Sequence, residues 1–557
     1  MEAARTKIRV NLFAGGGGAS CGELEAMGSS PDVAVNHWPQ AIAIHRANHP
    51  ETMHYIEDVF DVDPVEAAAG RPVGFLWMSP TCSHFSRAKG RALRDERIRA
   101  QAWIIRPWIE KTRPEVIVLE NVVEFETWGP LIDHHEDGCP GGADGEGCWD
   151  ACGYGRPDKA RAGETYCEWR DWITSQGYSF EARRLVAWEY GAPTTRERLY
   201  IIMRADGQSA RWPAPTHAPE PTSERPHRWR TAAEVIDWSI PCRSIFGRKK
   251  SLARATLSRL VRGTGKFVLE SDRPFLLRDG VPLGDVGGTG SEGVEAAAYL
   301  VKHFSERRPG EVMGQPMDRP MGTVTARDHH SLAVASLVKF YGTSTGAPLD
   351  RPLGAVTAQG MKHGLSVAYL SRYNGCSVGQ SPGSPLGTLD TRDRYSLVRA
   401  ELVDLAVLPS GSAASLGRAE LVDPAVLPSG SAASLGAAEL CDFPGLDEVT
   451  ARRARRVYDL MVEHGYQGPG LDHDLRIAFV RVDGAMYVVV DLAMRMLVPR
   501  ELFRAQGFPD SYVIDPVGPT GRPLSGRDQV RACGNSVCPP VARAIVASVL
   551  GSDLIAA

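Results

Sequence analysis

Short apolar runs alternate with helical segments through the first 200 residues, which is typical of an α/β fold. Apolar runs that end at glycine or polar residues predict strands at residues 8–13, 33–35, 55–59, 75–78, 116–119, 178–188 and 199–203. Helices are predicted between them, for example at residues 19–27 and 39–47. Near the other end of the chain, the pattern predicts a helix at 449–464, two short strands within 477–490 and a helix at 541–550. Strands separated by helices favour a doubly wound, largely parallel sheet.

The pattern changes near residue 205, where proline and arginine become frequent, and a helix-like piece follows at 232–238. Three segments, 320–332, 352–365 and 385–397, then share a Pro-x-Gly-x-x-x-Thr/Ala core. Such a repeat indicates one supersecondary unit used several times, here β-hairpins with polar tips. Arginines at these tips suit guanine in DNA, and repetition for stability alone is the alternative. The arginines are Arg327, Arg392 and Arg394.

A second repeat is of another kind. Residues 400–417 and 419–436 are near-copies that both end in LPSGSAASLG. This composition of alanine, serine, glycine and proline is typical of a linker. We therefore expect residues 400–436 to be a duplicated linker without chemistry of its own.

Composition sets broad limits on the class of protein. The 557 residues suffice for two to four domains, and 43% hydrophobic with 23% charged residues is ordinary for a globular protein. No apolar run reaches the roughly 18 residues that a membrane span needs, and the N-terminus lacks a signal-peptide core. We therefore expect a cytoplasmic protein with no membrane partner. The 11 scattered cysteines suit reduced thiols better than disulfides.

Charge alone does not indicate a nucleic-acid partner, because the net charge is −4. Basic residues are nevertheless clustered between residues 248 and 266 and alternate with leucines there. The cluster consists of Arg248, Lys249, Lys250, Arg254, Arg259, Arg262 and Lys266. Such a face can bind phosphate whatever the total charge, although a solvated helix face explains it equally well.

Two reactive side chains follow separate apolar runs. Cys82 lies in a polar loop after residues 75–78, with Ser83, His84 and Ser86 beside it. Glu120 follows residues 116–119, and a carboxylate at the tip of a central strand is costly unless it is used or paired. Open α/β sheets carry their chemistry at these strand ends, so we expect the thiol and the carboxylate to face one cleft.

The first predicted strand leads directly into the glycine-rich turn 14–18 and then a helix. This arrangement lets a backbone approach a nucleotide-like ligand closely, although it is neither G-x-G-x-x-G nor a P-loop. Asn36 ends the second strand, where it can hydrogen-bond a ribose hydroxyl. Asp58 can accept a hydrogen bond from an adenine amino group, or it caps a turn.

Arg196 and Arg198 begin a later strand with a spacing of two, so their side chains point the same way. One of them can hydrogen-bond a carbonyl oxygen of a ligand while the other secures the loop.

An insertion at residues 134–170 is rich in glycine, aspartate and cysteine. Its cysteines are structural zinc candidates by ligand count and type: Cys139, Cys148, Cys152 and Cys167. Their spacing is irregular, so a flexible surface loop with free thiols is the alternative.

In this order, six motifs resemble those of the C5-cytosine DNA methyltransferases. They are NLFAGGGG at 11–18, the Cys82 loop at 80–86, Glu-Asn-Val at 120–122, Arg-Glu-Arg at 196–198, the segment 500–509, and Gly-Asn-Ser-Val at 534–537. The resemblance implies a Rossmann-like α/β catalytic domain that uses S-adenosyl-L-methionine. It also implies a β-rich target recognition region at 206–495, inserted between catalytic parts 1–205 and 496–557. Double-stranded DNA is the implied partner of a monomeric enzyme, of the kind found in restriction-modification.

The same resemblance assigns roles to single residues. It implies that the Cys82 thiolate adds to C6 of a flipped-out cytosine while Glu120 protonates N3. C5 then takes the methyl group, and loss of its proton and of Cys82 gives 5-methylcytosine. Arg198 matches the arginine that holds the base's O2, and Arg196 is its supporting neighbour. The implied cofactor-binding residues are Phe13, Ala14, Gly15, Gly17, Asn36, His37, Asp58, Val59, Pro80, Asn535 and Val537.

Three positions depart from the family pattern. Thr81 precedes Cys82 where a second proline is usual, Thr194 replaces a glutamine, and Asn36 replaces a glutamate. None of these changes removes a reacting group. Two alternatives stay open at this point: a tRNA cytosine-5 methyltransferase, and a DNA-binding relative that has lost catalysis.

Overall fold

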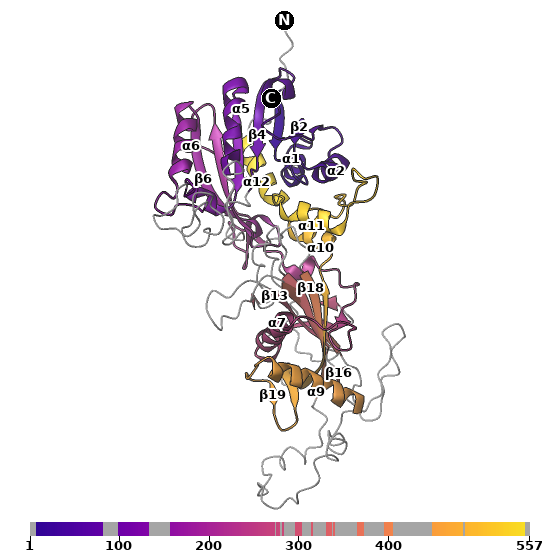
Figure 1. Cartoon of the computed structure of the whole chain (residues 1–557). Helices are drawn as coiled ribbons and strands as arrows, with labels where there is room; N and C mark the ends of the chain where they lie inside the picture. The colour runs from indigo at the N-terminus through magenta and orange to yellow at the C-terminus, as the bar shows by residue number, and fades with distance from the viewer. Residues whose placement is uncertain are drawn as a thin grey trace, which may run out of the picture.

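A seven-stranded sheet with the strand order β3-β2-β1-β4-β5-β7-β6 lies at the centre of the first of two lobes in the computed structural model (Figure 1). The structure describes residues 7–81, 99–132, 156–272, 274–278, 281–282, 296–302, 314–315, 330–336, 338–339, 365–372, 395–404, 448–482 and 485–551. The strands are β1 (Ile8–Leu12), β2 (Val33–Val35), β3 (Met53–Tyr55), β4 (Val73–Met78), β5 (Val116–Asn121), β6 (Ser179–Val186) and β7 (Glu197–Arg204). The order of the first five strands is that of a doubly wound Rossmann sheet, so the predicted Rossmann-like α/β domain is confirmed.

One strand of this sheet, β7, runs opposite to the other six. Strands β1 to β5 are parallel to one another, whereas β7 is antiparallel to β5, with Glu120 opposite Tyr200 and Asn121 opposite Leu199. Strand β6 is antiparallel to β7 in turn. The beginning of β7 therefore lies beside the end of β5, at the edge where open sheets carry their chemistry.

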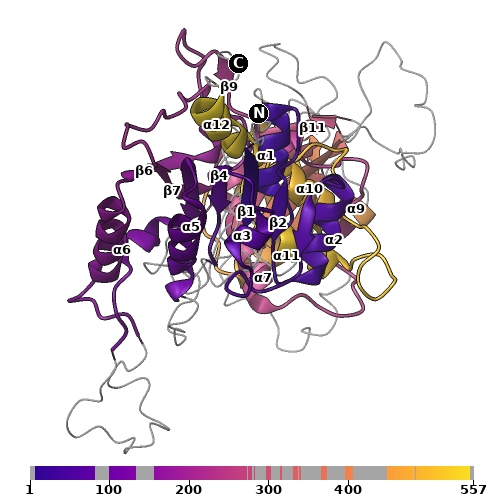
Figure 2. The same ribbon diagram turned by 90° about the horizontal axis from the view of Figure 1, so that it is seen from above.

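Helices cover both faces of this sheet (Figure 2). Helices α1 (Gly18–Met27) and α12 (Pro539–Leu550) pack on Trp77, Val118 and Ile202. Helices α3 (Pro64–Ala67), α5 (Ile105–Thr112) and α6 (Glu164–Ser175) cover the other face. Side chains alternate between the two faces along each strand. Because helices bury both faces, the central strands appear in the sequence as continuous apolar runs.

Helix α2 (Pro39–Asn48) packs with α10 (Pro499–Ala505) and α11 (Gly526–Gly534) in a core that continues into the second lobe. In Figure 1, α10 and α11 lie between the two lobes. Residues 526–550, which contain α11 and α12, are apolar enough by length and composition to count as a weak candidate for a membrane span. Most of that stretch is buried inside the protein, however, because α12 is a core helix of the first lobe.

The second lobe is built on a 12-stranded sheet. Strands β15 (His330–Ser336), β17 (Leu365–Arg372) and β18 (Tyr395–Asp404) are neighbours in it, and each begins at the end of one of the three repeated segments. The predicted β-rich middle region is therefore present. The repeat tips with Arg327, Arg392 and Arg394, and residues 405–436 of the predicted linker, lie outside the described residues. The linker prediction is wrong for residues 400–404, which are the end of β18 and pair with β21 (Ala485–Met496).

Two helices and two further strands of the second lobe lie where the sequence has distinct patterns. Helix α7 (Arg254–Thr264) carries much of the basic cluster, and α9 (Glu448–Glu463) is the amphipathic helix expected at 449–464. Strands β20 (Ile477–Val482) and β21 (Ala485–Met496) form the expected pair near residue 480. The exact limits of the catalytic parts and the inserted region stay predictions.

Two expected elements are wrong in extent. The third strand is β3 at Met53–Tyr55 rather than residues 55–59, because the chain turns at Asp58, whose side chain accepts a hydrogen bond from the Phe60 amide. The helix-like piece at 232–238 is only a short 3-10 turn, Ala232–Glu234. Asp237, within the predicted helix, instead accepts hydrogen bonds from the amide and hydroxyl of Ser239.

Candidate active site

Glu120 lies between two arginines at the carboxyl end of β5. Its Oε1 atom is 3.3 Å from Arg198 Nε and 3.7 Å from Arg196 Nη2, and all three side chains are at least 90% buried. Neither arginine makes a well-aligned hydrogen bond to Oε1, which has no hydrogen-bond partner among the described residues. A buried carboxylate oxygen without a hydrogen bond costs free energy unless a ligand donates one to it.

The reversed direction of β7 brings the two arginines to Glu120. Since β7 is antiparallel to β5, its first residues lie beside the last residues of β5. The buried Thr194 hydroxyl accepts a hydrogen bond from the Arg196 amide, and Arg196 Nη1 donates to the Gly534 carbonyl at 3.3 Å. The Gly-Asn-Ser-Val motif is thus connected directly to the carboxylate site.

Asn121 joins the end of β5 to the loop that follows β4. Its Nδ2 donates to the Pro80 carbonyl at 3.1 Å, and its Oδ1 accepts from the Val122 amide. The Thr81 amide in turn donates to Gln101 Oε1 at 3.1 Å. Cys82, the predicted nucleophile, lies outside the described residues, but the two residues before it are fixed beside the Glu120 strand.

A second thiol lies within this buried cluster. Cys538 donates a hydrogen bond to Gln506 Oε1 at 2.8 Å. Burial raises its pKa to about 11, an effect that the charges of Arg196 and Arg198 partly oppose. Cys538 is therefore a neutral thiol near pH 7, and a protonated thiol is a poor nucleophile.

The glycine turn follows β1 in a conformation that suits glycine. Gly15 and Gly17 have φ angles of 55° and 87°, and Phe13 also has a positive φ of 57°. The Ala14 amide donates to the Val35 carbonyl at the end of β2. At Gly15 an added Cβ would meet only the Phe13 carbonyl oxygen, at 3.8 Å, so this part of the backbone is open to a ligand.

The other side of the turn packs tightly against the C-terminal segment. A Cβ at Gly18 would lie 2.1 Å from the Val537 carbonyl oxygen and 2.2 Å from Ser536 Oγ. Val537 is buried there, while Asn535 is exposed. The structure thus brings together the glycine turn and the last motif, which are more than 500 residues apart in the sequence.

The remaining predicted cofactor residues follow β2 and β3. Asn36 Oδ1 accepts a hydrogen bond from the Trp38 amide at the start of α2, and His37 is exposed. Asp58 is exposed, and its carboxylate accepts from the Phe60 amide, as in the turn-capping alternative, while Val59 is buried. An adenosyl group fits this edge, because the open backbone at Gly15 and the ends of β1, β2 and β3 lie along one side of the sheet.

The zinc prediction falls mostly on residues that the structure does not describe. Cys139, Cys148 and Cys152 are among them, and Cys167 is an exposed free cysteine on α6. In the described parts of the chain, no group of three or more histidine, cysteine or acidic side chains could hold a metal ion.

Sequence reasoning missed a buried group beneath the glycine turn, which contains His45, His49 and Tyr512. His45 lies on α2 and His49 is the C-cap residue directly after it, and the His49 ring is 6.1 Å from that of Tyr512. The i, i+4 spacing of the histidines was visible in the sequence. The contact of His49 with Tyr512 was not visible there, because 463 residues separate the two.

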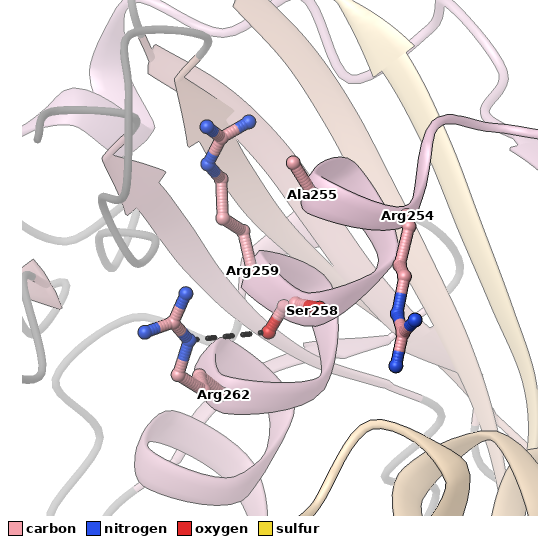
Figure 3. A pocket seen from close by; sticks show the side chains of 5 residues that line it. All are labelled: Arg254, Ala255, Ser258, Arg259 and Arg262. Carbon is pink, nitrogen blue, oxygen red and sulfur yellow. Dashed lines mark hydrogen bonds between the residues drawn. The ribbon is translucent and has the colours of Figure 1, made fainter. Parts of the chain in front are cut away.

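The basic cluster forms a pocket of about 330 Å³ along α7 (Figure 3). Its lining consists of Arg254, Ala255, Ser258, Arg259 and Arg262. Arg262 Nε donates to the Ser258 carbonyl at 3.4 Å, and Ser258 Oγ is 2.9 Å from His464 Nδ1. The helix turns its leucines inward, and Leu260 is fully buried, so its arginines line a concave surface.

Comparison with known proteins identifies the class of these motifs. The sequence profile described as "C-5 cytosine-specific DNA methylase" matches residues 8–127 and 454–551. These segments contain the glycine turn, the Cys82 loop, Glu120 and the Gly-Asn-Ser-Val motif. In these parts the chain is similar to the C-5 cytosine-specific DNA methylases.

Individual relatives agree with this family. The chain is 28% identical over 216 residues to type II methyltransferase M.AgeI of Thalassovita gelatinovora. This match covers 37% of this chain and 42% of that protein. The chain is 26% identical over 223 residues to M.AquIA of Picosynechococcus, covering 38% and 78% of the two chains. The match thus spans less than half of the length of M.AgeI.

Solved structures give more distant likenesses. DNMT2 from Spodoptera frugiperda is 12% identical with a TM-score of 0.40, and the match covers 98% of this chain and 99% of that one. A putative DNA modification methyltransferase from an E. coli prophage is 13% identical with a TM-score of 0.37, over 99% and 100% of the chains.

Proposed function

We propose that this protein is a DNA (cytosine-5-)-methyltransferase that acts on a flipped-out cytosine in duplex DNA. One observation carries the proposal. Glu120, Arg196 and Arg198 converge in a buried cluster that hydrogen bonds join to the loop before Cys82 and to the Gly-Asn-Ser-Val segment. The family of the matched segments supports the same activity.

In this proposal Glu120 holds a proton for N3 of the cytosine. Oε1 is buried and without a hydrogen-bond partner among the described side chains and backbone, so a ring nitrogen can complete it. Protonation at N3 withdraws electrons from C6 and makes that carbon easier for a thiolate to attack. Arg198 lies where its guanidinium can donate to the O2 atom of the same base, while Arg196 secures the site through Gly534.

Cys82 is the proposed nucleophile. Attack of its thiolate on C6 forms a carbon–sulfur bond and moves electron density to C5. After C5 has been methylated and has lost its proton, the carbon–sulfur bond breaks and the thiolate leaves. The hydrogen bonds of Pro80 and Thr81 to Asn121 and Gln101 hold the start of this loop beside the carboxylate.

S-adenosyl-L-methionine is the proposed cofactor and supplies an electrophilic methyl group when bound. We assign it to the glycine turn, Phe13, Ala14, Gly15 and Gly17, with Val59, Pro80, Asn535 and Val537 around it. Asn36, His37 and Asp58 are proposed for the ribose and adenine. The side-chain oxygens of Asn36 and Asp58 already accept backbone hydrogen bonds, so the Asn36 amide nitrogen is the group that would contact a hydroxyl.

Double-stranded DNA is the proposed partner, and helix α7 offers it a basic surface. Arg254 is exposed, Arg262 is half-buried, and both line the pocket in Figure 3. Guanidinium groups bind phosphate oxygens well because their planar donors match the phosphate geometry. We expect α7 to contact the DNA backbone and the second lobe to supply sequence recognition in a monomeric, intracellular enzyme.

Transfer of labelled methyl groups tests the activity. Purified protein, labelled S-adenosyl-L-methionine and duplex DNA should give 5-methylcytosine, and Cys82→Ser should abolish it while cofactor binding is largely kept. Absence of 5-methylcytosine, or a fully active Cys82→Ser variant, would refute the proposal. Trapping on DNA that contains 5-fluorocytosine separates an active enzyme from a DNA-binding relative, because trapping requires both attack and methyl transfer. Running tRNA in parallel decides between nucleic acids.

A further inference from the structure

A buried polar network lies directly beneath the glycine turn. Its members are Asn11, Ser20, His45, His49 and Tyr512, and each of them is at most 4% exposed. They come from β1, α1, α2 and the segment after α10. None of them has a role in the reaction proposed above.

The network meets the turn at Gly17. A Cβ there would lie 2.2 Å from the Tyr512 hydroxyl and 3.3 Å from both His45 Cδ2 and His49 Nε2. The Tyr512 hydroxyl also donates a hydrogen bond of 2.8 Å to the Gly16 carbonyl. The backbone of the turn therefore rests on these three rings, with one hydrogen bond fastening it to them.

Tyr512 is itself held firmly. The neighbouring residue Val513 makes two backbone hydrogen bonds of 2.8 Å to the Asn48 side chain at the end of α2. The ring of Phe508 lies 4.7 Å from the Tyr512 ring, and Phe503 stacks on it at 6.5 Å. The hydroxyl position is thus fixed by both α2 and the segment after α10.

Further hydrogen bonds connect the side chains behind Tyr512. Asn11 Nδ2 donates to Ser20 Oγ at 2.8 Å, and Ser20 Oγ is hydrogen-bonded to His45 Nε2, also at 2.8 Å. His45 Nδ1 is hydrogen-bonded to His54 Nε2 at 2.8 Å. Burial lowers the pKa of His45 and brings that of His49 to about 4, so both rings are neutral near pH 7. Buried side chains that are joined by hydrogen bonds in this way stiffen their surroundings.

Ser20 and His45 are hydrogen-bonded as a catalytic nucleophile and its base would be, but both residues are fully buried and cannot reach a substrate. The network therefore contacts the glycine turn and has no direct part in catalysis.

We propose that Tyr512, supported by His45 and His49, is a positioning residue that holds the glycine turn in its ligand-binding shape. The inference rests on the proposed function, since it takes the turn to be the cofactor site. Fixing the backbone before binding removes an ordering cost. Loss of the Tyr512 hydroxyl should therefore weaken cofactor binding and leave turnover at saturating cofactor nearly unchanged.

The test is calorimetric titration of the full chain with S-adenosyl-L-methionine, together with KM and kcat for methyl transfer. Tyr512→Phe removes the bond to Gly16 and the 3.4 Å contact of the hydroxyl with His49 Nε2. We expect its Kd and KM to rise about five- to tenfold with kcat within about twofold of wild type. Tyr178→Phe is the matched control, because Tyr178 also donates a buried hydrogen bond to a backbone carbonyl, that of Pro114, far from the turn. Its Kd should be unchanged. His49→Gln, measured in parallel, removes a ring against Gly17 and should raise Kd at least about threefold.

Unchanged Kd in Tyr512→Phe or in His49→Gln would overturn the positioning role, as would an equal rise in Tyr178→Phe. If Tyr512→Phe does not fold, as judged by circular dichroism, His49→Gln and the control decide the question. Failure of the wild-type protein to bind the cofactor would instead refute the proposed function.

Discussion

Glu23 on α1 should make the first lobe less stable as pH rises. Its side chain is fully buried, and the nearest positive charge, Arg9 Nη1, is 3.4 Å away. Burial raises the Glu23 pKa from 4.5 to about 7, against the opposing effects of Arg9 and a hydrogen bond from Asn11. Folding therefore favours the protonated form.

The sign and size follow from linkage between protonation and folding. Because the pKa is higher in the folded state, the unfolded chain ionises first, and stability falls as pH rises from 4.5 through 7. The shift of the Glu23 pKa from 4.5 to about 7 corresponds to a loss of about 3 kcal/mol in the free energy of unfolding at pH 8 and above. In Glu23→Gln this loss is absent, and Arg9 keeps its hydrogen bonds to Ser29 and Ser30.

Thermal unfolding followed by circular dichroism between pH 4.5 and 8.5 measures the effect. Near pH 4.5 we expect Glu23→Gln and wild type to melt at similar temperatures, whereas at pH 8.5 the variant should melt about 6 °C higher. The comparison is made between the two proteins because His45, His49 and His54, whose pKa values burial lowers, add a stability loss below pH 6.5 to both. Glu57→Gln, at an exposed position, is the control. A melting difference that is the same at both pH values would refute the reasoning.

Three further substitutions test other parts of the structure. Gly17→Ala places a Cβ 2.2 Å from the Tyr512 hydroxyl at a φ of 87°, so it should lower stability by about 2 kcal/mol and weaken cofactor binding; normal melting and normal titration would contradict this. Glu501→Ala leaves the buried Arg495, now 2.7 Å from the carboxylate, without its partner and should cost about 3–5 kcal/mol in urea unfolding, whereas a loss below about 1 kcal/mol would show that the pair is unimportant. Asn121→Ala removes the hydrogen bond to the Pro80 carbonyl in the loop after β4. It should lower kcat about tenfold or more, because that loop carries the proposed nucleophile, with little change in cofactor Kd. An unchanged kcat would show that the Asn121 side chain does not position the loop.

Much of the first lobe could be predicted from the sequence because its strands are buried on both faces and read as apolar runs. The glycine turn and the position of Glu120 at the end of β5 followed from those runs. The direction of β7 did not follow, since the local pattern around Arg196 and Arg198 is the same in a parallel and an antiparallel strand. That direction alone decides whether the arginines reach Glu120.

The contacts of Tyr512 and the hydrogen bonds of Asn36 and Asp58 could not be predicted from the sequence either. The Tyr512 hydroxyl contacts Gly16 across 496 residues, and no local pattern encodes such a contact. Asn36 and Asp58 were chosen for their positions after strands, but short polar side chains there also bond to the backbone two residues on. Both do so in the structure, and only coordinates could distinguish these local bonds from contacts with a ligand.

The close packing of α1 on α12 has a consequence for how the protein is made. At Gly22 an added Cβ would lie 2.6 Å from Ala542 Cβ, the Arg543 amide nitrogen and the Pro539 carbonyl oxygen, so α12 fits directly against α1. Yet α12 leaves the ribosome roughly 510 residues after α1. At about 5–20 residues per second, this delay lasts from about half a minute to nearly two minutes. From the synthesis of β7 until α12 emerges, the nascent sheet lacks α12, and the apolar face formed by Trp77, Val118 and Ile202 is open on the α12 side to chaperones and to other nascent chains.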